Sequence, residues 1–174
     1  LNHSKILALL GLQERAIISW YGSVYEPKAL DPLHGLGFFM KKPIDEVESA
    51  FKIIRQVLLE YKQFLNQYNT RLVIVLFPQR FQVQPSDWEL TVKEYRLNET
   101  CFDLDQPNNR IIRFCKKNNL ECIDPTSNMR MLHEKTGVNY YLPLGDMHWN
   151  AQGHEALVES IWGELFPNRL LAIE

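Results

Sequence analysis

The spacing of apolar positions predicts a long helix followed by a buried strand. Between residues 43 and 69, apolar side chains recur every three or four positions, the period of one helix face. These are Val47, Phe51, Ile54, Leu58, Tyr61, Leu65 and Tyr68. Acidic residues at 45, 46 and 48 favour the start of this helix, because negative charge is stabilised near a helix amino terminus. The run RLVIVLFP at 71–78 is typical of a parallel strand covered on both faces.

A second helix and strand follow in the same order. Residues 106–120 have the pattern of a helix, and ECIDP at 121–125 that of a short strand ended by proline. Two successive helix-to-strand units predict an α/β fold with a parallel sheet. The remaining expected elements are a short helix at 126–136, an extended piece at 140–142 and a closing amphipathic helix at 151–166.

The first part of the chain lacks the strands that such a sheet needs. Residues 4–20 indicate helical segments interrupted near Gly11, and glycines and prolines make 21–43 a long loop-rich excursion. Residues 79–106 also read as loops without a chemical signature. We therefore interpret 1–174 as a single domain, or the carboxyl-terminal portion of one, whose amino-terminal strands lie outside this chain.

Composition narrows the class of protein. The 174 residues, 45% hydrophobic and 23% charged, are ordinary for a globular domain. A net charge of -2 with scattered Lys and Arg argues against a nucleic-acid partner. No apolar run approaches the ~20 residues of a membrane span. The three cysteines have no C-x-x-C spacing and are expected to be small apolar or half-buried side chains. None of this assigns a compartment.

The chemically distinctive stretch is YYLPLGDMHWNAQGHEAL, residues 140–157. Asp146 precedes His148 by two positions on a loop that enters the last predicted helix. Such a carboxylate can hold the imidazole Nδ1, which makes Nε2 a general base. Asn150 is expected to cap the helix, and Gly153 suits a close approach of backbone or substrate. The alternative is that these residues form only a well-capped helix start.

The string DMHWNAQGH after YYLPLG resembles the carboxyl-terminal Asp-His block of the SGNH (GDSL-type) hydrolases. The likeness extends along the chain in order. LVIVLFPQRFQVQPSDW and DQPNNRIIRFCKKNNLECIDP look like a strand with its loop and a helix with its strand in a bacterial subgroup of that superfamily. LNHSKILALL is similar to a short helical segment that comes earlier in the same subgroup.

The resemblance implies a three-layer αβα, flavodoxin-like fold, here incomplete. It implies an esterase, lipase or other acylhydrolase, or an acyltransferase, with a Ser-His-Asp triad. His148 would be the general base and Asp146 its orienting acid, with no metal or organic cofactor. The substrate would be a small-molecule ester or an acylated carbohydrate, and a bacterial cell envelope location would fit. Gln79 and Arg80 match a loop near the family's site, without an assigned role.

The nucleophile of that triad is not recognisable in the sequence. The chain has no G-D-S, G-x-S-x-G or G-x-N-D motif, and Ser23 is the only serine with a neighbouring glycine. We therefore expect the nucleophile and the oxyanion donors to lie in an amino-terminal part outside this chain. The missing amino-terminal part would be a partner of this chain, because it would complete the domain. This chain alone would be inactive.

Two other interpretations stay open. Asp146 and His148 could bind metals, as in metallophosphoesterases, but the 26 residues after His148 offer no second metal-spaced pair. The chain could instead be a non-catalytic α/β module that binds a carbohydrate or protein partner and keeps the Asp-His pair as architecture.

Overall fold

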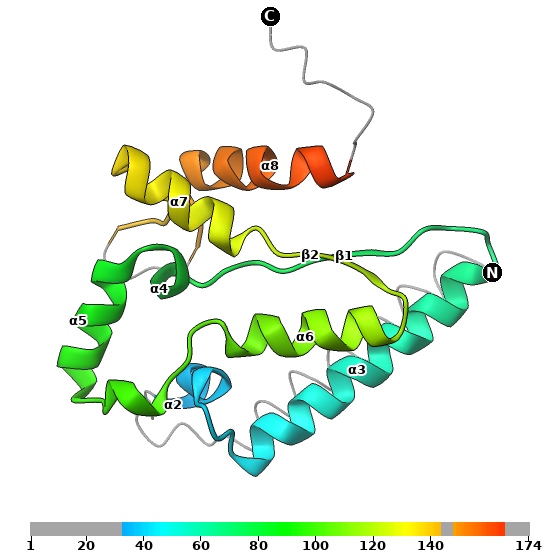
Figure 1. Ribbon diagram of the computed structural model, residues 1–174, viewed down its shortest axis with the longest axis horizontal. Helices are drawn as coiled ribbons and strands as arrows, with labels where there is room; N and C mark the ends of the chain where they lie inside the picture. Colours follow the sequence, from blue (N-terminus) through cyan, green and yellow to red (C-terminus); the bar gives the residue numbers. More distant parts are fainter. Residues whose placement is uncertain (1–32, 144–147, 166–174) are drawn as a thin grey trace, which may run out of the picture. The chain divides into compact units, whose positions relative to one another are not determined.

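The computed structural model describes residues 33–143 and 148–165 of the chain (Figure 1). The chain divides after Gly35, and all the packing described below lies within the second unit, Leu36–Glu174. The predicted helical segments at 4–20 lie outside the described residues.

The described residues form helices and two short strands. The helices are α2 (Leu33–Leu36), α3 (Asp45–Asn66), α4 (Arg80–Val83), α5 (Pro85–Tyr95), α6 (Gln106–Lys117), α7 (Thr126–Thr136) and α8 (Ala151–Leu165). The strands are β1 (Val73–Val75) and β2 (Glu121–Ile123). Two 3-10 turns, η1 (Gly37–Phe39) and η2 (Glu99–Cys101), complete the set.

β1 and β2 pair in parallel, which confirms the general α/β prediction. Their register is Val73 with Glu121, Ile74 with Cys122 and Val75 with Ile123. β1 is shorter than the predicted strand 71–78, and its three residues are only partly buried. Phe77, which the prediction placed within the strand, lies beyond its end and is 62% exposed. The reason is that β2 is the only strand beside β1 among the described residues.

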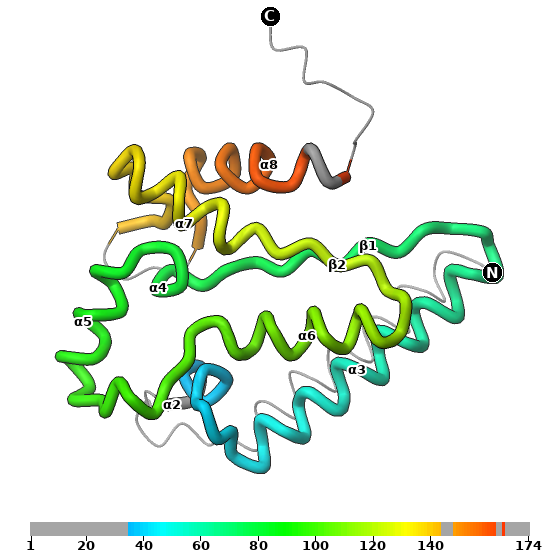
Figure 2. Tube along the Cα trace, in the orientation of Figure 1, coloured from blue at the N-terminus to red at the C-terminus, as the bar shows by residue number. Residues whose placement is uncertain are grey.

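Helices α3 and α6 pack against the strands through one apolar cluster. Its buried members are Val47, Phe51, Ile111, Cys115 and Leu120. Strand residues Ile74 and Cys122 pack against this cluster. In Figures 1 and 2, α3 and α6 lie on one side of the strands, and α7 and α8 lie on the other.

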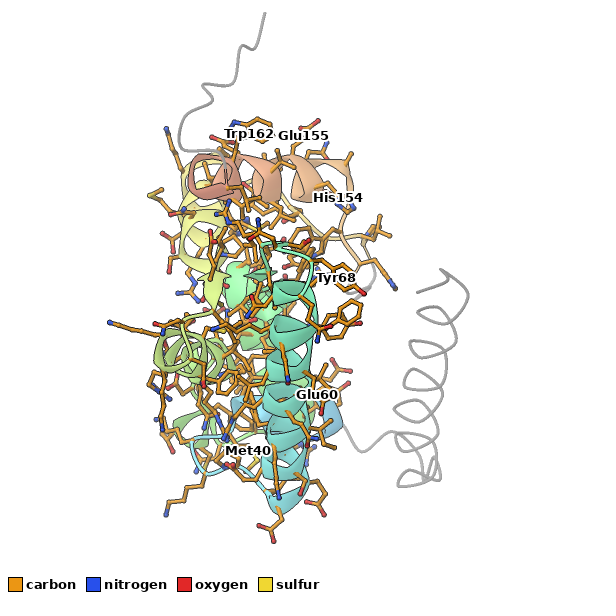
Figure 3. The ribbon with its side chains drawn as sticks, turned by 90° about the vertical axis from the view of Figure 1, so that its right-hand side faces the viewer. Met40, Glu60, Tyr68, His154, Glu155 and Trp162 are labelled. Atoms are coloured by element: carbon orange, nitrogen blue, oxygen red, sulfur yellow. The ribbon has the colours of Figure 1, made fainter. Side chains whose placement is uncertain are left out.

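The predicted apolar face of α3 is only partly buried. Val47 and Phe51 are in the core, whereas Ile54 and Tyr61 are 38% and 37% exposed. Tyr68, just beyond the helix, is 52% exposed and extends from its outer side (Figure 3). The described elements pack against the side of α3 that carries Val47, Phe51 and Leu58. The adjacent side, which carries Ile54 and Tyr61, remains exposed.

Two more clusters hold the other helices. Phe81, Trp88 and Phe102 form an aromatic group with Leu36 and Phe39. The second cluster joins α4, α7, α8 and the segment between the last two helices. Its buried members are Val83, Met129, Tyr140, Tyr141, Ala156 and Leu157.

Most of residues 79–106 is helical, so the prediction of loops for this segment was wrong. The side chain of Gln82 accepts from the Gln79 amide at the start of α4, and Pro85 opens α5 at a position where a missing N–H costs nothing. Trp88 fixes α5 by inserting into the aromatic cluster. The apolar positions were too few in each short helix to give a periodic signal.

The end of the predicted 21–43 excursion is also more regular than expected. Residues 33–39 form α2 and η1, and Leu36 and Phe39 are buried. Residues 21–32 lie outside the described part of the chain. The composition of this segment predicted a loop because Gly35 and Gly37, which are poor helix formers, flank Leu36.

Candidate functional site

His148 lies on one of two short segments that run antiparallel to each other, residues 140–142 and 148–150, called here the paired arms. Tyr141 and Trp149 form an isolated antiparallel bridge. The Leu142 amide donates to the His148 carbonyl at 2.9 Å, and the Asn150 amide donates to Tyr140 at 3.0 Å. These bonds hold the backbone from His148 to Asn150 in place.

The paired arms are attached to the carboxyl end of β1. The Tyr141 hydroxyl donates to the Pro78 carbonyl at 2.8 Å, and Arg80 Nη1 donates to the Leu142 carbonyl at 3.1 Å. Burial raises the pKa of the Tyr141 phenol far above its usual range, so this donor stays protonated. The arms thus lie where α/β proteins place their ligand sites, beyond the carboxyl ends of the strands.

Of the predicted acid and base, the structure describes only the base. His148 is exposed on the paired arms. Asp146 lies outside the described residues, so its contact with the His148 imidazole stays a prediction.

The serines that the structure describes all lie within helices. Ser160 is buried, and its hydroxyl donates to the Ala156 carbonyl of the same helix at 2.7 Å. Ser23 lies outside the described part. The remaining described serines are exposed: Ser49, Ser86 and Ser127.

An exposed aromatic ring, which the sequence did not single out, lies beside the arms. Phe77 projects from the end of β1 and packs on Trp149, with ring centroids 5.2 Å apart. Trp149 also contacts the rings of Tyr141 and His154, at 6.0 and 5.8 Å. His154 is labelled on α8 in Figure 3. The sequence placed Phe77 in a buried strand, because an apolar run does not show where the sheet stops covering it.

The entry to α8 has the predicted construction. Asn150 Oδ1 accepts from the Gly153 amide at 2.8 Å, as a helix cap should. A Cβ added at Gly153 would lie 2.2 Å from the Tyr140 carbonyl oxygen. Both predictions are confirmed, and the close approach at Gly153 is to backbone.

A polar network joins the carboxyl ends of the two strands. Asn108 Nδ2 lies 3.0 Å from Asp124 Oδ1 and donates to Thr126 at 2.9 Å. The side chain of Gln82, which is buried, donates to the Leu104 carbonyl at 2.7 Å. The Gln82 carbonyl accepts from Arg130 Nε at 2.7 Å. The network provides hydrogen-bond partners for polar groups at the edge of the core. The sequence predicted only that ECIDP ends a strand, and not these contacts.

The cysteines and other metal-ligand residue types do not assemble a site in the described region. No group of three His, Cys, Asp or Glu side chains converges within residues 33–143 and 148–165. Burial raises the pKa of the Cys115 and Cys122 thiols, that of Cys122 to about 12, so both are poor nucleophiles. Cys115 is buried and Cys122 half-buried as expected, whereas Cys101 is exposed.

Comparison with known proteins adds no relative. No family model matches this chain, and no curated protein or solved structure is significantly similar to it. Over residues 33–143 and 148–165, none of the helices has both the length and the apolar character needed to cross a membrane.

Proposed function

We propose that this chain is the base-carrying part of an SGNH-type ester or acyl hydrolase, or of an acyltransferase. The observation that carries the proposal is the position of His148. It is exposed on backbone-paired arms that are tied to the carboxyl end of a parallel strand. A general base for acyl transfer needs this combination of access and fixed geometry.

In the proposed mechanism, His148 takes the proton of a serine hydroxyl and later returns it to the leaving group. Asp146 accepts from the His148 Nδ1–H, orients the ring and stabilises the imidazolium. The serine and the oxyanion donors come from a part of the intact protein outside residues 1–174. The substrate is an ester, and an acylated carbohydrate is one class that suits the exposed ring of Phe77.

The proposed fold is a three-layer αβα domain with further strands. Two features support it: helices lie on both sides of the strands, and one edge of β1 has no partner among the described residues (Figure 1). Parallel strands with helices on both faces are usual in such domains, which need more than two strands to be stable.

The proposal is tested by labelling the intact protein with a fluorophosphonate, a probe for activated serines. We expect one labelled serine outside residues 1–174. His148→Ala should slow its labelling by roughly 10²- to 10⁴-fold, the usual contribution of a general base. Glu134→Ala, a change of an exposed residue in α7, should leave the rate unchanged. Labelling that is equally fast in His148→Ala would refute the role of His148.

The exposed ring of Phe77, which packs on the half-buried Trp149, favours a second candidate, a non-catalytic module that binds carbohydrate. A flat ring face can be covered by the C–H face of a sugar. In that case no serine of the intact protein would react with the probe, and Phe77→Ala would weaken carbohydrate binding. Detection of a His148-dependent labelled serine excludes this candidate.

A further inference from the structure

Arg80 occupies a central place among the contacts that hold the paired arms. It is the first residue of α4, just beyond the strand end. Its Nη1 donates to the Leu142 carbonyl, and the amide of the same Leu142 donates to the His148 carbonyl. Only one residue therefore stands between the guanidinium and the backbone of the proposed base.

The other side of the Arg80 guanidinium is fixed by Asp87 of α5. Arg80 Nε lies 2.8 Å from Asp87 Oδ2, and the two side chains are only 19% and 14% exposed. Gln84 Nε2 donates to the same carboxylate oxygen at 2.6 Å, and the Gln84 Oε1 accepts from the Tyr140 amide at 3.0 Å. Asp87 thus reaches the 140–142 arm by two routes, through Arg80 to Leu142 and through Gln84 to Tyr140.

We propose that Arg80 is a positioning residue for His148. It holds the 140–142 arm against the end of β1 and thereby sets the place of His148 on the opposite arm. This inference rests on the proposed function, since it needs His148 to act as the base. Arg80 itself is not assigned contact with substrate.

The geometry explains why arginine stands at this position. The planar guanidinium donates through Nη1 to the Leu142 carbonyl and forms an ion pair with Asp87 on its Nε side, and its rigid plane fixes the angle between these two contacts. Lysine offers a single ammonium on a flexible stem and would keep one of the two contacts well but not both. A half-buried Asp87 without any cation would also be costly.

The inference is tested by fluorophosphonate kinetics on the intact protein. In Arg80→Met we expect the maximal inactivation rate, kinact, to fall about 10- to 100-fold, because small misplacements of reacting groups have effects of that size. The probe concentration for half-maximal rate, KI, should change little. Arg80→Lys should recover part of the rate. Arg71→Met is the matched control, since Arg71 pairs with Glu121 on the exposed surface, and it should match the wild type.

A merely structural Arg80 would lower the fraction of folded protein without changing kinact of the remainder. A kinact in folded Arg80→Met within twofold of wild type would overturn the inference. If Arg80→Met does not fold, kinact is measured in Arg80→Lys instead. A wild-type kinact in Arg80→Lys would also overturn the positioning role of Arg80.

Hydrogen–deuterium exchange provides a readout that does not depend on activity. We expect the peptide that contains Tyr140 and Leu142 to exchange faster in Arg80→Met, while peptides of α3 are unchanged. Loss of labelling in Arg80→Met but not in His148→Ala would defeat the proposed function. Loss in His148→Ala, with neither exchange nor labelling altered in Arg80→Met, would defeat the role of Arg80 alone.

Discussion

The contacts around Gly153 show how a single residue sets the path of the chain into α8. The Tyr140 carbonyl oxygen occupies the space that a Cβ at position 153 would need, and it accepts from the Asn150 amide. Asn150 Oδ1 in turn accepts from the Gly153 amide. Because Tyr140 belongs to the paired arms, this turn determines both the start of the helix and the position of the arm opposite His148.

We expect Gly153→Ala to destabilise the protein by about 1–3 kcal/mol, the usual effect of forcing an extra group into a packed site. The new methyl would lie 2.2 Å from backbone oxygen, which cannot move as a flexible side chain could. Urea unfolding measures the change. Gly35→Ala is the control, since nothing lies within 4 Å of a Cβ there. Equal stability of the two variants would contradict the close approach.

The cysteines differ in access to solvent, and this difference predicts their reactivity. We expect one fast equivalent of thiol labelling in the native protein, at Cys101, and two slow ones. Cys115 is buried, and burial raises the pKa of both slow thiols, which lowers their thiolate fraction. Ellman's reagent with and without urea tests this. Fast labelling in Cys101→Ser would contradict the packing of α6 on β2.

The contact between α3 and α6 combines apolar packing with one arginine. The Arg110 guanidinium lies over the Phe51 ring, 4.0 Å from its centroid. The same group donates to both carboxylate oxygens of Glu48, at 2.8 and 2.6 Å. Arg110 therefore holds the first turns of α3 against α6, and its positive charge is paired with the half-exposed carboxylate of Glu48.

This pair gives α3 a defined pH dependence. The hydrogen bond from Arg110 holds the pKa of Glu48 below its ordinary value of 4.5. The stabilisation is complete above that value and is lost as the pH falls through the lowered pKa of the folded state. We expect Glu48→Gln to cost a few tenths to about 1 kcal/mol at pH 7, since Glu48 is half exposed.

The difference between Glu48→Gln and wild type should shrink as the pH falls below 4.5 and vanish below the lowered pKa of Glu48 in the folded state, where both side chains are neutral. Thermal unfolding from pH 2 to pH 7 measures this. Glu46→Gln is the control, because Glu46 is exposed in the same helical turn and has the same relation to the helix dipole. A pH-independent effect of Glu48→Gln would show that the ion pair does not form.

The residues described in the structure form three apolar clusters, and polar contacts join them. Gln82, between Phe81 of the aromatic cluster and Val83 of the α7–α8 cluster, binds Arg130 through its carbonyl. Its side chain lies 3.2 Å from Asn108 Oδ1, near the start of α6. Because these groups are buried or half-buried, separating the clusters would leave polar atoms without partners.

We therefore expect the clusters to unfold together in one cooperative transition. Phe51→Ala in the α3–α6 cluster should cost about 3–5 kcal/mol, and Met129→Ala in the α7–α8 cluster about 2–5 kcal/mol. Both should shift the same single transition, followed by tryptophan fluorescence and by circular dichroism. Two separate transitions in either variant would show that the clusters fold independently.

Local signals in the sequence were enough for much of the fold and for part of the candidate site. Helices α3, α6, α7 and α8 begin close to their predicted starts, and β2 lies within ECIDP. Asn150 and Gly153 also act as predicted. In each case the signal is a period, a cap or a turn, and it depends on residues within a few positions of one another.

The contacts that position the candidate site could not be read in this way. Pro78 and Tyr141 are 63 positions apart, and Arg80 and Leu142 are 62 apart. An apolar residue does not show what covers it, so the sequence predicts Phe77 and the outer face of α3 as core, although both are exposed. Periodicity reports which side chains avoid water, whereas exposure and attachment depend on which distant segments meet. The sequence indicates His148 as a candidate base, and the packing of the paired arms on the end of β1 gives it a defined place.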